Sequence, residues 1–365
     1  MIQILFTIFS ILALLVSGVN RNTASLSIVV AVISIFFGLV YLFKQTNEIK
    51  IPKYFNFIFI FNIILFIYPF FIENRNNPIY YALMFFVSSI YWLLFYNLKR
   101  GSIILKWIVL SVPVFAGLVY LLSNTINPDF LKLSELFFIE NLGGRHYLIG
   151  NVWVFALLTV ALDDQNKFSI SKIFIYLSAL FFIVLSNSRS AYLSLIAGLI
   201  SFGSSVKLNV KLKKIIVSLS FIITIFFIIS SIGRTTIFSR PYFVQSVESF
   251  AKYPLGVGMG NFEKISTEYY ASEKDLSKFS IYTHSIFLEA LSGVGIFSIV
   301  FLLFTYKVIS NIFKSKNRKR LSVWSIVFVA MTINFAVDTT YTIPGMLWLW
   351  FMILGSLQRE MDQKK

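Results

Sequence analysis

Long apolar segments recur along the whole chain, and they constrain its fold more than any other feature. A helix that crosses a lipid bilayer needs about 20 mostly apolar residues. The 365 residues contain about twelve such segments, which predict an all-α polytopic membrane protein. Their approximate bounds are 2–19, 26–43, 54–72, 79–98, 103–123, 149–162, 170–186, 190–206, 215–232, 283–306, 321–337 and 341–357. The shortest, 149–162, favours a tilted or partly re-entrant helix.

The composition excludes the other broad classes of protein. Hydrophobic residues make up 57% of the chain and charged residues only 13%, whereas an ordinary soluble domain has roughly 25% charged residues. A soluble chain of this length could not bury so much apolar surface. Aromatic residues at 18% argue against disorder, and the absence of Cys excludes a disulfide scaffold. No internal repeat or low-complexity linker divides the chain, so we expect one integral domain over residues 1–365.

The basic residues predict the orientation of the spans. A net charge of +16 is also typical of nucleic-acid binding, but cytoplasmic loops of membrane proteins carry an excess of Lys and Arg. With the N-terminus inside, the inner segments hold 21 of the 32 basic residues and the outer segments 11. Residues 1–19 have no basic start and no cleavage pattern of a signal peptide, and are predicted as the first span. We therefore expect two cytoplasmic termini and no nucleic-acid partner.

Two outer segments are much longer than the others, at roughly 124–148 and 233–282. Every other outer connection has only a few residues. Functional residues are concentrated in loops held by a rigid scaffold. A site on the outer face is therefore expected to combine these two loops with the ends of the adjoining helices.

Two arginines stand out among the outer residues. Arg189 lies in the short sequence S-N-S-R-S between two apolar spans. Because an arginine at mid-membrane depth costs roughly 2.5–3.5 kcal/mol on insertion scales, it either extends to the lipid headgroups or binds an anion in a cavity. Arg145 follows two glycines at the entrance of the 149–162 span, where it is either an ordinary loop residue or another anion ligand.

The longer outer loop carries Arg240 and, about fifteen residues later, the sequence Y-P-L-G-V-G-M-G-N-F. Gly256, Gly258 and Gly260 resemble a loop whose free backbone N–H groups cradle a phosphate. Their spacing is not the G-x-G-x-x-G of a dinucleotide-binding fold, and no strand precedes them. We therefore expect these glycines and Asn261 to shape a site rather than to react.

The span that starts at residue 283 opens with the sequence T-H-S-I-F-L-E. His284 is expected to open this helix at the outer surface, with Glu289 about one and a half turns deeper and on the same face as Ser285. A carboxylate inside a transmembrane helix predicts a functional role; a structural pair with an arginine is the alternative. No metal site is expected, because the chain has no Cys and only two His.

Taken in order, these motifs resemble the O-antigen polymerase and O-antigen ligase superfamily of bacterial envelopes. The resemblance depends on the S-R-S turn before a helix, on Arg240 before P-L-G-V-G-x-G-N-F, and on T-H-S-x-x-L-E after the long outer loop. Many members have H-N where this chain has His284 and Ser285. The motifs cover about residues 186–306. Upstream, Arg145 before Asn151 is less similar to a family R-x-x-G-x-x-x-N region.

The resemblance implies a GT-C-like fold and an inverting glycosyltransferase that needs neither metal nor cofactor. Its donor and acceptor would be glycans on undecaprenyl pyrophosphate, joined at the periplasmic face of the bacterial inner membrane, and a chain-length regulator protein is a candidate partner. Arg189, Arg240 and Arg145 would bind the pyrophosphate, because guanidinium groups fork onto phosphate oxygens. His284 would take the proton of the attacking hydroxyl. Glu289 would orient His284 or serve as the base itself.

Two other functions remain open at this stage. An O-antigen ligase would transfer the glycan to lipid A–core, although a compact chain with 41 Phe favours a polymerase. A lipid-linked oligosaccharide flippase, or another transporter, suits twelve spans. A transporter would place charged residues along a central pathway and break helices at mid-membrane, whereas the unusual polar residues of this chain collect on the outer side.

Overall fold

The structure, a computed structural model, is helical throughout the part of the chain that it describes. It describes residues 1–16, 21–46, 48–125, 147–162, 170–205, 223, 225, 241–273, 279–314 and 322–363. No strand occurs among these residues. Four helical segments in them are long and apolar enough to cross a membrane: Leu26–Phe43, Asn76–Asn97, Gly101–Leu118 and Ile286–Lys314. This is the architecture of a helical membrane protein, while the total of twelve spans stays a prediction.

The helices follow the predicted spans closely. The first half contains α1 (Ile2–Leu15), α2 (Arg21–Phe43), α3 (Phe55–Ile67) with the 3₁₀ turn η1 (Tyr68–Phe71), α4 (Asn76–Asn97), α5 (Gly101–Thr125), α7 (Tyr147–Ala161) and α8 (Ile170–Ser186). The second half contains α9 (Arg189–Ser205), α11 (Pro241–Lys252), α12 (Phe262–Glu273), α13 (Ile286–Val294), η3 (Gly295–Ser298), α14 (Ile299–Lys314), α15 (Val323–Val337), η4 (Thr339–Thr342) and α16 (Pro344–Gln363). Every predicted span except 215–232 overlaps one of these helices. Apart from residues 223 and 225, the 215–232 span lies outside the described residues.

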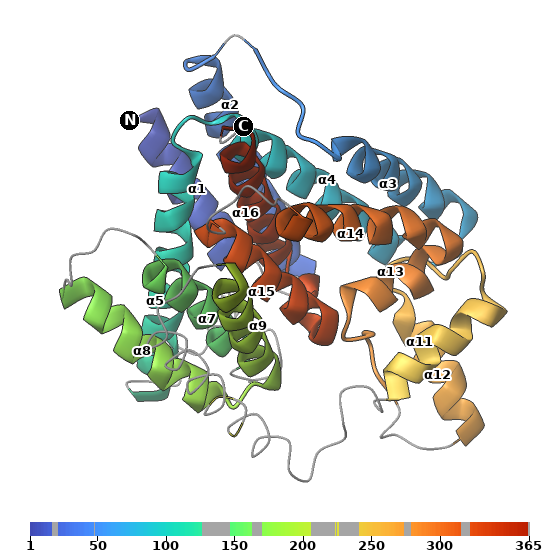
Figure 1. Ribbon diagram of the computed structural model, residues 1–365. Helices are drawn as coiled ribbons and strands as arrows, with labels where there is room; N and C mark the ends of the chain where they lie inside the picture. The colour runs from blue at the N-terminus through green and yellow to red at the C-terminus, as the bar shows by residue number, and fades with distance from the viewer. Residues whose placement is uncertain are drawn as a thin grey trace.

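Helix α16 lies at the centre of the bundle and packs against α4, α15, α1 and α5 (Figure 1). It is buried continuously from Pro344 to Gln358, as expected for a helix that is apolar on all sides. A side chain at Gly355 would come within 2.6 Å of the Trp92 carbonyl oxygen, so this glycine allows α16 to approach α4 closely. The Trp92 indole N–H donates to Gln358 Oε1 at 3.1 Å and further fixes the pair.

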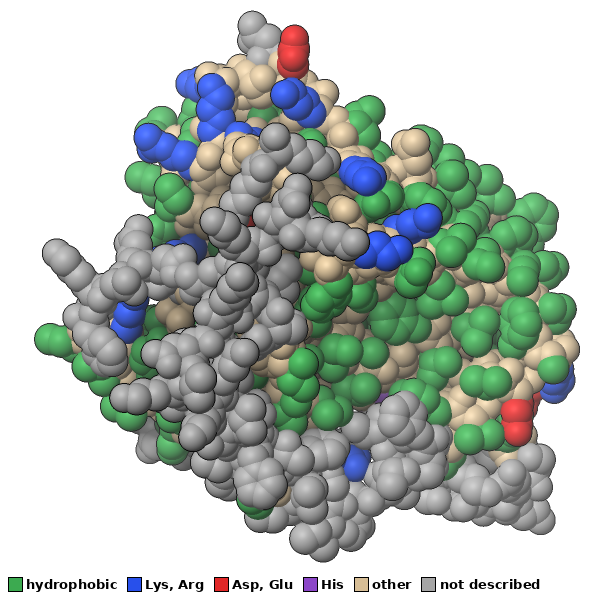
Figure 2. All heavy atoms as spheres, in the orientation of Figure 1, with side chains coloured by type: hydrophobic (Ala, Val, Ile, Leu, Met, Phe, Trp, Pro, Cys, Tyr) green, Lys and Arg blue, Asp and Glu red, His purple; other side chains and the backbone are tan. Residues whose placement is uncertain are grey.

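The outside of the bundle is apolar where a soluble protein would be polar. On α8, Phe174, Leu177 and Phe181 are all exposed, and such surfaces mark contact with lipid or with another protein. Figure 2 shows hydrophobic side chains covering the flank formed by α3 and α14, while Lys and Arg gather at the top, beside the chain termini. The sequence predicts that such a basic end faces the cytoplasm.

The structure adds detail to two of the predicted regions. The predicted span 283–306 overlaps the apolar helical segment Ile286–Lys314, within which η3 separates α13, ending at Val294, from α14; Gly295, with φ at 56°, lies at this break. The 233–282 loop, in its described part, contains the two helices α11 and α12. Both are too polar and too short to be detected as membrane spans. They pack against α13 and so lie beside the predicted site.

Candidate functional site

Glu289 is the centre of a fully buried polar cluster at the start of α13, where its side chain is 0% exposed. Its Oε1 accepts a hydrogen bond from the Gly260 N–H at 2.8 Å. Its Oε2 accepts from the Tyr341 hydroxyl at 3.0 Å and from the Thr283 hydroxyl at 3.2 Å. A buried carboxylate requires such donors to compensate for lost hydration. Glu289 therefore fixes the glycine loop, the residue before His284 and the η4 turn to one another.

The glycine loop, residues 256–261, is folded onto the end of α13. Gly256, Gly258 and Gly260 have φ angles of 88°, 96° and 81°, which glycine adopts without strain. The Gly258 N–H donates to the Gly293 carbonyl oxygen at 2.7 Å, and the Gly256 N–H donates to that of Tyr253 at 2.8 Å. Since the Gly260 N–H binds Glu289, the N–H groups of all three glycines are used within the protein. The similarity to a phosphate cradle therefore does not extend to its free N–H groups.

Asn261 attaches the other side of the glycine loop to the start of α4. Its side chain is only 5% exposed, and its Nδ2 donates to the carbonyl oxygens of Asn74 at 2.9 Å and Val257 at 3.0 Å. The Asn77 side chain in turn donates to the Gly260 carbonyl oxygen at 2.8 Å. The loop is thus held between the α3–α4 connection and α13.

His284 lies just before α13 rather than in its first turn, which corrects the prediction that it opens the helix. The helix begins at Ile286 with Ser285 as its N-cap, and His284 has φ at 56°, in the left-handed region. Its ring stacks on that of Tyr242 from α11, with centroids 4.3 Å apart and planes 17° apart. A non-glycine residue in this region costs of order 1–3 kcal/mol, and such strain clusters at functional sites.

Arg189 is the first residue of α9 and follows a tight turn in which Asn187 has φ at 45°. The next residue anchors this turn: the Ser190 hydroxyl donates to the Asp338 carboxylate and lies 3.2 Å from Asn151 Oδ1. Asn151 Nδ2, from α7, also donates to Asp338 Oδ2 at 3.3 Å. The Ser-Arg-Ser turn is therefore attached to both α7 and the end of α15, which fixes the backbone that carries the partly buried Arg189.

The segment 338–342 joins these two clusters, and the sequence interpretation missed it. Asp338 binds the Ser-Arg-Ser turn and accepts from the Thr339 N–H at 2.7 Å, whereas Tyr341, three residues later, binds Glu289. The sequence does hold a signal for it, namely an acid and three threonines between two apolar spans. Because no recognised motif includes them, only the folded structure shows what they contact.

Two of the three predicted pyrophosphate ligands, Arg145 and Arg240, lie outside the described residues, which resume at Tyr147 and Pro241. Among the predicted site residues that are described, Glu289 contacts Gly260 directly and reaches His284 through the adjacent Thr283. Arg189 belongs to the second cluster, which segment 338–342 connects to the first. The described predicted residues therefore form two connected groups rather than one.

The phenol of Tyr282 lies close enough to the cluster around Glu289 to be affected by its charge. Burial raises its pKa to about 12, and the negative charges of Glu289 and Glu263 act in the same direction. The hydroxyl therefore stays protonated at neutral pH and can donate a hydrogen bond. Together with the imidazole of His284, it places two side chains that can form hydrogen bonds in the segment just before α13.

Comparison with known proteins does not assign the chain to a family. No family model matches it, and no curated protein sequence matches it either. Within the part of the chain that the structure describes, no group of three or more His, Cys, Asp or Glu side chains could hold a metal ion.

Proposed function

We propose that this protein is a surface-polysaccharide polymerase of the O-antigen type, an inverting glycosyltransferase in the bacterial inner membrane with both termini in the cytoplasm. It joins repeat units carried on undecaprenyl pyrophosphate at the periplasmic face. One observation carries the proposal: the glycine loop, the T-H-S-x-x-L-E segment and the 338–342 segment all converge on Glu289 through hydrogen bonds of 2.8–3.2 Å. Two of these three are the motifs on which the family resemblance depends.

The reaction requires three tasks from this site. An acceptor hydroxyl attacks the anomeric carbon of the donor sugar, and the bond from that carbon to the pyrophosphate oxygen breaks, which releases undecaprenyl pyrophosphate. His284 takes the hydroxyl proton, since a neutral imidazole is a suitable base near pH 7. Arg189, Arg240 and Arg145 bind the pyrophosphate and balance its developing charge. Glu289 and the glycine loop hold the segment that carries His284.

The test is deletion of the gene in its host followed by electrophoresis of the surface glycan. A product with a single repeat unit supports the polymerase. Lipid-linked polymer that accumulates without surface glycan indicates a ligase, and lipid-linked units trapped on the inner leaflet indicate a flippase; either result would overturn the proposal.

Single substitutions then test the assigned roles in the complemented deletion strain. We expect Arg189→Ala, Arg240→Ala and His284→Ala each to lower polymer formation by about 10²–10³-fold, as loss of one preorganised group does in other enzymes. Arg75→Ala, at the exposed start of α4, and His146→Ala, which removes the other histidine, are the matched controls. Full polymer formation by all three site variants at normal expression would contradict the catalytic assignment.

A further inference from the structure

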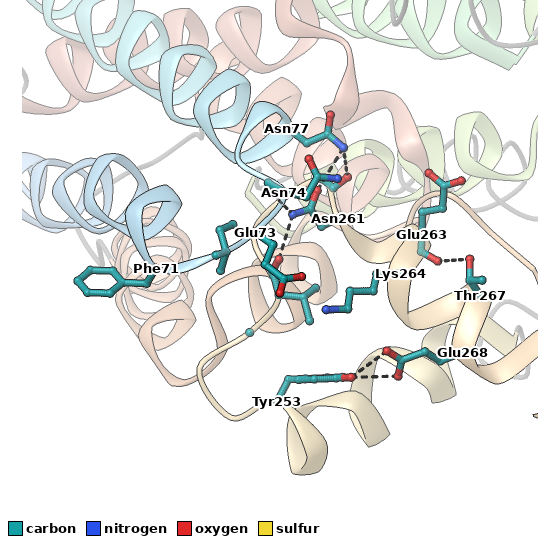
Figure 3. A pocket seen from close by; sticks show the side chains of 14 residues that line it. Phe71, Glu73, Asn74, Asn77, Tyr253, Asn261, Glu263, Lys264, Thr267 and Glu268 are labelled. Carbon is teal, nitrogen blue, oxygen red and sulfur yellow. Dashed lines mark hydrogen bonds between the residues drawn. The ribbon is translucent and has the colours of Figure 1, made fainter.

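A cleft of about 690 Å³ opens between the α3–α4 connection and the segment that runs from Tyr253 through α12 (Figure 3). Its volume lies within the range of small-molecule sites, roughly 300–1,000 Å³. Polar side chains line it from both walls: Glu73 and Asn74 from the connection with Asn77 from the start of α4, and Lys264, Thr267 and Glu268 from α12. None of these residues belongs to the catalytic or pyrophosphate-binding set proposed above.

The cleft combines hydrogen-bond acceptors and donors around an aromatic ring. Glu73 and Lys264 extend into the same space from opposite walls (Figure 3). The Tyr253 hydroxyl donates to Glu268 Oε1 at 2.9 Å, which orients the phenol ring, and Lys264 Nζ lies 6.0 Å from the centre of that ring. Carboxylates accept from hydroxyl groups, while the ammonium group and the amides donate to them. A ligand with many hydroxyl groups can satisfy all of these side chains.

The charge of the cleft disfavours a phosphate. Its lining contains three glutamates, Glu73, Glu263 and Glu268, and one lysine, Lys264. Lys252, just outside the lining, pairs with Glu268 at 2.6 Å, so the balance of the cleft stays negative although the chain as a whole carries a net charge of +16. Like charges repel an anion strongly where water is partly excluded. The polar lining disfavours a purely apolar ligand as well. An uncharged polyhydroxyl compound, which means a carbohydrate, fits this chemistry best.

The position of the cleft connects it to both the proposed site and the membrane surface. Gly260 lines the cleft, and its peptide group donates to Glu289 and accepts from Asn77. Phe71, which lines the cleft, is 79% exposed and lies one residue before the end of the predicted span 54–72, where a helix would leave the bilayer. A glycan that extends from a lipid carrier would begin at this depth.

We propose that this cleft is a carbohydrate-binding subsite, which holds sugar residues of the lipid-linked glycan and leaves the pyrophosphate to the arginines. The identification of the glycan as the ligand rests on the proposed function, whereas the carbohydrate chemistry follows from the lining itself. Contact of the sugars with the Gly260 segment places them next to the structure that holds His284. The cleft therefore orients a substrate, and no bond is made or broken in it.

The test measures binding of the free repeat-unit oligosaccharide, released from the host's lipid carrier, to the purified full-length protein. We compare the wild type with Glu73→Gln and Lys264→Gln, alone and combined; both positions are exposed, so these changes leave the fold intact. Glu48→Gln, at the exposed α2–α3 connection, is the matched control. We expect the double variant to raise the Kd about tenfold, as the loss of one or two charged hydrogen bonds does, and the control to leave it unchanged. Binding of sugar-free undecaprenyl pyrophosphate should not change in any variant.

Three results would overturn the subsite: an unchanged Kd in the double variant, an equal loss in Glu48→Gln, or an equal loss of sugar-free undecaprenyl pyrophosphate binding. Failure of the proposed function has a different signature. If the wild-type protein binds the free oligosaccharide through Glu73 and Lys264 but forms no polymer, the polymerase assignment fails and the carbohydrate site stands. If polymer formation depends on Arg189 and His284 but glycan binding ignores the cleft variants, only the subsite fails.

Discussion

The two acidic residues at the centre of the site, Glu289 and Asp338, are bound in different ways. Glu289 is fully buried, and one of its oxygens accepts from a backbone N–H of the glycine loop. Asp338 is partly exposed, and its Oδ1 accepts from the N–H of the next residue, Thr339. Its Oδ2 accepts from the side chains of Ser190 and Asn151 on other helices. A carboxylate that holds backbone in a dry interior is part of the fold. A carboxylate that holds other side chains at a wetter position can rearrange when a substrate arrives.

This difference separates two kinds of contribution to function. Substitution of Glu289 should disturb folding first and activity as a consequence. Substitution of Asp338 should leave the bundle folded and disturb the turn that carries Arg189. We therefore expect substitution of Glu289 to lower mainly the stability of the protein, and substitution of Asp338 to lower mainly its activity.

Glu289→Ala is expected to have the largest effect on stability. It removes the acceptor for Gly260, Thr283 and Tyr341, and each buried donor left without a partner costs about 1–3 kcal/mol. We expect a loss of about 3 kcal/mol or more, measured as a lower thermal unfolding midpoint in detergent. Glu289→Gln keeps the shape and one acceptor oxygen, so it should lose clearly less. An unchanged midpoint for the alanine variant would contradict the central role assigned to this carboxylate.

Gly256→Ala tests the loop that Glu289 holds. The new Cβ would lie 2.4 Å from the Gly293 carbonyl oxygen, at a residue with φ at 88°, and neither the contact nor the strain can relax without movement of backbone. We expect a loss of about 2–3 kcal/mol, within the range for strained backbone positions, in the same unfolding measurement. Gly198→Ala in α9 is the control, because there the nearest atoms belong to the flexible Leu158 side chain. Equal losses in the two variants would show that the positive φ and the backbone contact are unimportant.

The fold was predictable from sequence wherever a helix is apolar along its length. The position and approximate bounds of α4 and α5, for example, follow from hydropathy alone. Helices α11 and α12 were not predicted, because they are polar and stabilised by contacts with each other and with α13. The start of α16 at Pro344, rather than at 341, follows from proline's preference for a first helical turn and its restriction of the preceding residue, a local signal that hydropathy does not detect.

The site was predictable as a set of residues but not as an arrangement. Glu289 and the three glycines stand out because a carboxylate in an apolar span and clustered glycines are unusual. The contact of Glu289 with Tyr341, 52 residues away in the chain, depends on how helices pack, which a single sequence does not encode locally. Asp338 was missed for the same reason, since its significance comes from the Ser190 and Asn151 side chains that it contacts.

Asp338→Asn should show the reverse pattern to Glu289→Ala. An amide in place of the carboxylate keeps the shape but presents a donor to Ser190 and Asn151, so we expect a stability loss of only about 1 kcal/mol. Polymer formation should fall about 10- to 100-fold, because small displacements of a substrate-binding group have effects of this size. Ser194→Ala in α9 is the control, since that buried hydroxyl donates only to the Ser190 carbonyl oxygen of its own helix. A variant that loses stability and activity in the same proportion as Glu289→Ala would remove the distinction between the two clusters.

The ion pair beside the cleft should give the smallest effect. Lys252 Nζ lies 2.6 Å from Glu268 Oε2, with both side chains substantially exposed. Partial burial alone would raise the pKa of Glu268, but hydrogen bonds from Lys252 and Tyr253 more than offset it and hold that pKa below its ordinary value of 4.5. A lowered carboxyl pKa contributes stability that is present above the unfolded pKa and is lost as the pH falls through the folded pKa. Glu268→Gln should therefore lower the unfolding midpoint slightly at pH 7 and not at all at a pH below the folded pKa.

High salt should have the same effect as acid on this pair, because the Debye length falls to about 3 Å at 1 M ionic strength. Glu48→Gln, at the other exposed connection, should change nothing under either condition. A midpoint shift as large at pH 7 as that of Glu289→Ala would mean that the outer helices α11 and α12 contribute as much to stability as the buried cluster. Since surface ion pairs contribute little, we expect the stability of the site to depend on the buried carboxylate and its backbone donors.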